Sequence, residues 1–118
     1  MILIINTVKR EKIELGLFDG KIHRCFYFET EKQSEDLLIA IDGILKENKL
    51  KLKDLKAILV NCGPGSFTGV RVGVTAANTF GWSLNIPVFG YRDGELEKIL
   101  NKKITQSKFS KPALPYYE

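Results

Sequence analysis

Residues 57–89 decide the fold, and they read AILVNCGPGSFTGVRVGVTAANTFGWSLNIPVF. The segment begins with the apolar run 57–60 and ends with a second one at 86–89, and such short, fully apolar runs are typical of strands buried on both faces. The distance between them is about the length of a helix, which we expect over residues 68–84. Strand, helix and strand in this order predict a parallel crossover and therefore an α/β fold.

The same segment differs from the rest of the chain in charge. Residues 1–60 carry eleven basic and ten acidic side chains, whereas residues 61–91 carry a single charge, on Arg71. A stretch so poor in charge is not typical of a solvated surface. We therefore expect parts of it to be buried in the core and other parts to lie against a partner.

Three strands and a helix are predicted ahead of this segment. Residues 2–7 are almost continuously apolar, residues 12–18 alternate, and residues 22–28 are rich in β-branched and aromatic side chains. Asp19-Gly20 is typical of a hairpin turn. Thr30 and Gln33 have the spacing of a capping box, and the apolar stripe that follows predicts an amphipathic helix over about 34–48.

Size and composition exclude several classes of protein. A chain of 118 residues with 44% apolar and 27% charged residues is an ordinary globular chain with one core. A formal charge of +4 tolerates a nucleic-acid partner without arguing for one. No apolar run reaches the eighteen or so residues of a membrane span, and the start does not resemble a signal peptide, so we expect a cytoplasmic protein with no membrane contact.

The inventory of metal-binding side chains is also small. The chain has Cys25, Cys62 and one histidine, His23, so neither a zinc site nor a disulfide framework can be built from it. We expect no metal and no cofactor. We further expect Cys62 to be a small buried hydrophobe rather than a nucleophile.

The loop after residue 60 lies where helix N-termini hold anions, but it fits none of three common motifs. A Walker A loop needs a lysine before its Ser or Thr, a Rossmann fingerprint needs glycine at 68, and a nucleophile elbow around Ser66 needs glycines at 64 and 68. Ser66 and Thr68 are better explained as helix-capping groups. A nucleotide-binding or phosphotransfer enzyme that uses loop 63–69 stays open as an alternative.

Small residues recur every fourth position in the helix that follows the loop, at Gly69, Gly73, Ala77 and Gly81. Glycine in a helix costs roughly 1 kcal/mol relative to alanine, so this ridge needs a compensating close approach of another element. The ridge packs either on the first helix of the same domain or on a helix of a second protein. The pattern alone leaves both interpretations open.

The run from Gly63 to Gly73 resembles the signature of the bacterial TsaB (YeaZ) family. Residues 55–58 and 86–88 are similar to the strands that flank this signature, and residues 2–7 are similar to the first strand, although Asn6 stands where the family usually has Asp. The resemblance covers residues 1 to about 91. The signature residues of the loop and helix start are Gly63, Pro64, Gly65, Ser66, Phe67, Thr68, Gly69 and Arg71.

The resemblance implies the first of the family's two actin-like (ASKHA, ribonuclease H-like) domains, with a mixed five-stranded sheet and flanking helices. Most of the second domain is missing, and residues 111–117 resemble the family's carboxyl-terminal tail. We therefore expect a domain at 1–103 and a tail at 104–118, in a reduced or truncated member of the family.

The resemblance also implies a non-catalytic scaffold or activator in the synthesis of tRNA N6-threonylcarbamoyladenosine (t6A). The implied partners are a TsaD-type catalytic subunit, a TsaE-type ATPase and, indirectly, tRNA, with a homodimer possible. A tRNA-binding module acting through the basic tail is a third interpretation. The interface is expected on the helices at 34–48 and 68–84, at Leu38, Ile41, Leu45, Gly69, Val70, Gly73, Ala77, Phe80 and Gly81.

Three further expectations concern single residues. Arg71 is either a structural cation or the partner of a carboxylate on a second protein. Phe80 and Trp82 are expected to be core or interface anchors. Gly73→Leu is expected to abolish pairing and to leave the domain folded.

Overall fold

The structure is a computed structural model that describes residues 1–101. The predicted boundary after residue 103 and the tail at 104–118 lie outside the described residues. The elements follow one another as β1 (Ile2–Asn6), β2 (Lys12–Phe18), β3 (His23–Glu29), α1 (Gln33–Glu47), a 3-10 turn (Leu52–Asp54), β4 (Ala57–Asn61), α2 (Phe67–Leu84), β5 (Val88–Tyr91) and α3 (Leu96–Leu100).

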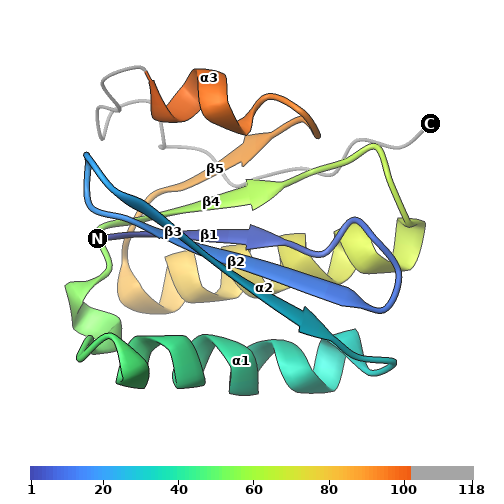
Figure 1. Cartoon of the computed structure of the whole chain (residues 1–118), viewed down its shortest axis with the longest axis horizontal. Helices are drawn as coiled ribbons and strands as arrows, with labels where there is room; N and C mark the ends of the chain where they lie inside the picture. The colour runs from blue at the N-terminus through green and yellow to red at the C-terminus, as the bar shows by residue number, and fades with distance from the viewer. Residues whose placement is uncertain (102–118) are drawn as a thin grey trace.

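One five-stranded sheet, in the order β3-β2-β1-β4-β5, organises the domain. β1 pairs antiparallel with β2, and β2 pairs antiparallel with β3, whereas β1–β4 and β4–β5 are parallel. α1 and α2 cover one face of the sheet, and α3 lies on the other (Figure 1). The predicted α/β fold with a mixed sheet and a parallel crossover through α2 is confirmed.

The last strand begins two residues later than the sequence predicts. Asn85 adopts the left-handed conformation with φ 55°, and the Ile86 N–H donates to the Gly81 carbonyl at 2.9 Å, which closes the C-terminus of α2. Ile86 therefore belongs to the helix cap and cannot pair as a strand residue. Pro87 contributes only its carbonyl, which accepts from the Ile58 N–H.

The start of α1 also differs from the predicted capping box. The N-cap residue is Lys32, which makes no side-chain cap bond, and the Thr30 hydroxyl bonds to Asp36 instead. The Gln33 amide donates to the carbonyls of Thr7, Lys9 and Lys12 at 2.7–3.2 Å. Gln33 therefore links the start of α1 to the β1–β2 connection by hydrogen bonds. In a capping box its side chain would instead have bonded to the backbone at the start of α1.

The ridge of small residues on α2 packs against the sheet of its own domain. A Cβ added to Gly73 would stand 2.5 Å from Thr7 Oγ1, one added to Gly69 would overlap the Thr7 carbonyl oxygen, and one added to Gly81 would overlap Val88 Cγ2. Ala77 is fully buried. The main neighbours of the ridge are therefore the sheet and the segment after β1, which neither interpretation drawn from the pattern named, and α1 approaches the ridge through Gln33 at Gly69.

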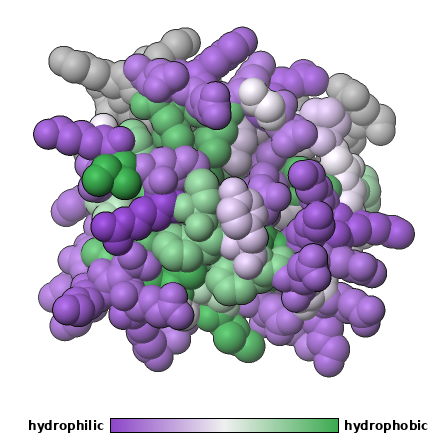
Figure 2. Space-filling view, in the orientation of Figure 1, coloured by the Kyte–Doolittle hydropathy of each residue, from purple (hydrophilic) through white to green (hydrophobic). Residues whose placement is uncertain are grey.

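The larger core fills the space between the sheet and the two long helices, and a smaller cluster of Ile4, Phe18, Leu59 and Tyr91 lies on the α3 side. Figure 2 shows polar side chains around the margin of one face, with apolar side chains gathered between them. At the edge of the sheet, β3 is half-buried or exposed along its whole length. β3 is thus the one strand of the described sheet without a buried residue.

Candidate functional site

A groove of about 700 Å³ runs between α1 and α2 on the outside of the molecule. Its apolar lining comes from both helices: Leu37, Leu38, Phe67, Val72, Ala76 and Phe80. Hydroxyl groups complete it, from Ser34, Thr68, Thr75, Thr79 and Ser83. Among the described residues that line the groove, the single charge is that of Arg71.

Large apolar side chains stand exposed in this groove and elsewhere on α2. Leu38 is 55% exposed, Phe67 57% and Trp82 86%, so Trp82 is not a core residue. The Arg71 guanidinium lies over the Phe67 ring, 5.3 Å from its centroid, a cation–π contact that fixes the charge at the start of α2. Contiguous exposed apolar surface of this kind is typical of an interaction site. Within residues 1–101, no helix combines the length and apolarity needed to cross a membrane.

The groove contains only part of the interface predicted from the sequence. Leu38 and Phe80 line it, together with Phe67, Thr68 and Arg71 of the signature. The other seven predicted interface residues are buried in the domain's own core and cannot contact a partner: Ile41, Leu45, Gly69, Val70, Gly73, Ala77 and Gly81. These residues are spaced along the face of each helix that packs on the sheet. The same spacing suits a partner interface, so the sequence pattern could not distinguish the two.

The sequence reasoning missed the hydroxyl-bearing residues of α2. Thr75, Thr79 and Ser83 recur every fourth residue and face the groove with the exposed side of the helix. The available signal was a solvent-facing helical stripe with hydroxyls in place of charges.

The glycine loop, residues 63–69, is hydrogen-bonded to other parts of its own domain. The Ser66 N–H donates to the Val8 carbonyl and the Gly63 N–H to Asn61 Oδ1, both at 2.8 Å, while the Cys62 N–H donates to Tyr91. Ser66 caps α2 by accepting from the Gly69 N–H at 3.3 Å, as predicted. Four N–H groups that could have held an anion are therefore directed at acceptors of the chain itself.

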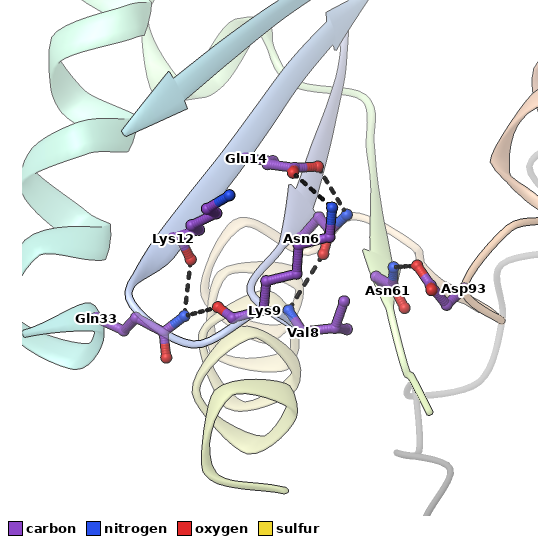
Figure 3. A network of polar contacts seen from close by, with 8 residues as sticks. All are labelled: Asn6, Val8, Lys9, Lys12, Glu14, Gln33, Asn61 and Asp93. Carbon is purple, nitrogen blue, oxygen red and sulfur yellow. Dashed lines mark hydrogen bonds and ion pairs between the residues drawn. The ribbon is translucent and has the colours of Figure 1, made fainter. Parts of the chain in front are cut away.

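A polar network occupies the carboxyl ends of β1 and β4 (Figure 3). Asn6 donates to Glu14 at 3.1 Å and accepts from the Val8 N–H, and the buried Asn61 donates to Asp93 at 2.9 Å. In both amides the nitrogen thus donates to a carboxylate and the oxygen accepts from a backbone N–H. Within the described part of the chain, no group of three or more His, Cys, Asp or Glu is placed to hold a metal ion.

Cys62 behaves as the small hydrophobe that the sequence predicts. The side chain is completely buried, its Sγ donates to the Val60 carbonyl, and burial raises the pKa of the thiol to about 11. A thiol with this pKa holds almost no nucleophilic thiolate near neutral pH.

These features define a ribonuclease H-like, actin-like domain with an exposed groove between its two long helices. A family model described as "TsaD: tRNA N6-adenosine threonylcarbamoyltransferase" matches residues 29–115. The chain belongs to this family, and within it the homology is to the amino-terminal domain of the TsaB (YeaZ) proteins, which take part in t6A biosynthesis.

Several curated relatives are TsaB proteins. The TsaB protein of Bacillus subtilis is 49% identical over 70 residues, which are 59% of this chain and 31% of the relative. The TsaB protein of Escherichia coli is 31% identical over 90 residues, which are 75% of this chain and 38% of the relative. The chain therefore spans about a third of the length of these relatives.

Solved structures agree on the fold. YeaZ from Pseudomonas aeruginosa superposes with a TM-score of 0.72 at 26% identity and covers 78% of this chain and 44% of that one. RuvC from Thermus thermophilus, in complex with a Holliday junction substrate, superposes with a TM-score of 0.52 at 12% identity, a likeness of fold alone.

Proposed function

We propose that this chain is a non-catalytic scaffold or activator in t6A synthesis that pairs with a TsaD-type catalytic subunit through the groove between α1 and α2. The observation that carries the proposal is the groove itself, an exposed apolar surface on the two longest helices. The proposed process, t6A synthesis, rests on the family, since the relatives are named for t6A biosynthesis.

The composition of the groove suits a helical partner. Aromatic side chains and an arginine are the residue types that dominate binding energy at interfaces, and this groove has Phe67, Phe80 and Arg71. Charged residues are depleted at interface centres, which matches the stripe of hydroxyls on α2. An apolar helix with a carboxylate opposite Arg71 would complement the surface, as in other helix-in-groove complexes.

The polar groups near the glycine loop support the non-catalytic part of the proposal. Asn6 stands where the family usually has Asp, and its amide is engaged by Glu14 and Val8. The N–H groups of loop 63–69 that donate within the domain disfavour the phosphotransfer alternative, because that reaction needs them on phosphate. The proposal further includes a TsaE-type ATPase as a partner, indirect contact with tRNA, a possible homodimer and a cytoplasmic location. It includes no cofactor.

Reconstitution tests the proposed role. Purified alone, the chain is expected to form no t6A on unmodified tRNA and to hydrolyse ATP no faster than buffer. Added to a TsaD-type subunit, a TsaE-type ATPase and a source of the threonylcarbamoyl group, it is expected to raise product formation. Product from the chain alone would overturn the non-catalytic assignment, and an unchanged rate in the full mixture would overturn the activator assignment.

A further inference from the structure

A second cavity, of about 530 Å³, lies on the α3 side of the sheet and is separate from the proposed partner groove. Ile4 and Leu96 contribute apolar surface, and the edge strand adds the largely exposed Tyr27. Three carboxylates line the cavity, those of Glu14, Asp93 and Glu97, and no lysine or arginine is among its described lining residues. The cavity thus combines an apolar wall with a concentration of negative charge.

The Tyr91 side chain lines this cavity with an unsatisfied hydroxyl. Tyr91 is 3% exposed, and its oxygen has no hydrogen-bond partner in the described structure. Burial, and then the carboxylates of Asp93 and Glu14, raise the pKa of Tyr91. The Asn61 amide lies close enough to oppose the shift in part, but it does not reach hydrogen-bond geometry with the hydroxyl. Leaving a buried polar group unpaired is costly, so the hydroxyl points to a ligand that would satisfy it.

The two central carboxylates are held in place by neutral groups. Asn6 binds one oxygen of Glu14, and Asn61 binds Oδ1 of Asp93, so neither carboxylate is neutralised by its partner. The Lys9 ammonium stands 4.0 Å from the other oxygen of Glu14, on a mostly exposed side chain. An ammonium of the chain itself therefore already approaches this site, at the limit of an ion pair.

We propose that this cavity binds a small organic cation, an ammonium or guanidinium compound with an apolar body, between Glu14, Asp93 and the Tyr91 hydroxyl. The nitrogen groups donate to the carboxylates and to the phenol oxygen, and the apolar part lies on Ile4 and Leu96. Tyr27 offers a ring face for a cation–π contact at the edge. The volume and the apolar wall favour such a molecule over a bare ion, which would contact oxygen ligands alone.

Calorimetric titration of the full chain with 1,4-diaminobutane at low ionic strength tests this site. We expect one equivalent to bind, and we expect Glu14→Gln and Asp93→Asn each to weaken binding by about tenfold, the typical loss of a hydrogen bond to a charged group. Both variants keep the oxygen that accepts from the neighbouring amide. Glu47→Gln, on the α1 side of the sheet, makes the same change in charge and is expected to leave binding unaltered.

Tyr91→Phe separates a ligand contact from a structural role. We expect this variant to bind the diamine more weakly and to melt at a higher temperature, because it removes an unsatisfied buried group. A lower melting temperature would show that the hydroxyl has a structural partner and would overturn the assignment. The proposal also fails if the diamine does not bind, if Glu47→Gln weakens binding as much as Glu14→Gln does, or if Mg²⁺ alone binds instead with the same dependence on Glu14 and Asp93.

Discussion

Replacing Gly73 with leucine is expected to destabilise the domain itself rather than only to detach it from a partner. The Cβ alone would stand 2.5 Å from Thr7 Oγ1 and would reach Ile5 and Val60 of the sheet. Overpacking of this kind costs about 1–3 kcal/mol. The displaced Thr7 hydroxyl would also lose its bond to the Gly69 carbonyl, which adds about 1–3 kcal/mol for a buried group left unpaired.

This loss is large beside a domain stability of about 5–15 kcal/mol. Urea denaturation followed by circular dichroism measures it. The matched control is Gly43→Ala on α1, where an added Cβ meets nothing within 4 Å, and which should stabilise the helix by up to about 1 kcal/mol. A Gly73→Leu protein as stable as the parent chain would contradict the packing of α2 on the sheet.

Leu38→Asp is expected to abolish binding to the TsaD-type subunit while the domain stays folded. Leu38 lines the groove and is 55% exposed, so a carboxylate there remains hydrated in the free chain but is desolvated in the complex. Interface anchors of this kind contribute about 2–4 kcal/mol, which corresponds to a loss of affinity of about thirty- to a thousandfold. Calorimetry with the purified catalytic subunit measures the change.

The neighbouring residue provides the control. Ile39 is 70% exposed and lies on the same helix, but it lines a different cavity between α1 and β3. Ile39→Asp makes the same chemical change at a site of similar exposure and should leave the affinity nearly unaltered. Equal losses for the two variants, or no loss at Leu38, would exclude the groove as the binding surface.

The sequence predicts the elements of this fold well because their signals are local. Two apolar strands around a helix-length segment give the parallel crossover, and the alternation in residues 12–18 gives β2 with its exact bounds. Boundaries fail where backbone groups find other partners. Ile86 closes the cap of α2, and Gln33 reaches three carbonyls of the β1–β2 connection, and neither role is visible without the tertiary arrangement.

The site was less predictable for a physical reason. Small residues at every fourth position indicate a close approach, but their spacing does not say which element approaches. Here Thr7, just after β1, approaches Gly69 and Gly73, and Val88 of the sheet approaches Gly81. The proposed partner groove lies on the other side of the same helix. The Asn61–Asp93 bond joins residues 32 apart in sequence and carries no local signal. Exposed apolar residues such as Trp82 become informative only once burial is known.

Hydrogen–deuterium exchange of the full chain, with and without a TsaD-type catalytic subunit, tests whether the groove between α1 and α2 receives the partner. We expect slower exchange in the complex at the start of α1 around Leu38 and along α2, with little change in β3 and at the carboxyl end of α1. Slower exchange confined to β3 or to the segment after β5, with α2 unchanged, would contradict the claim that the groove between α1 and α2 receives the partner.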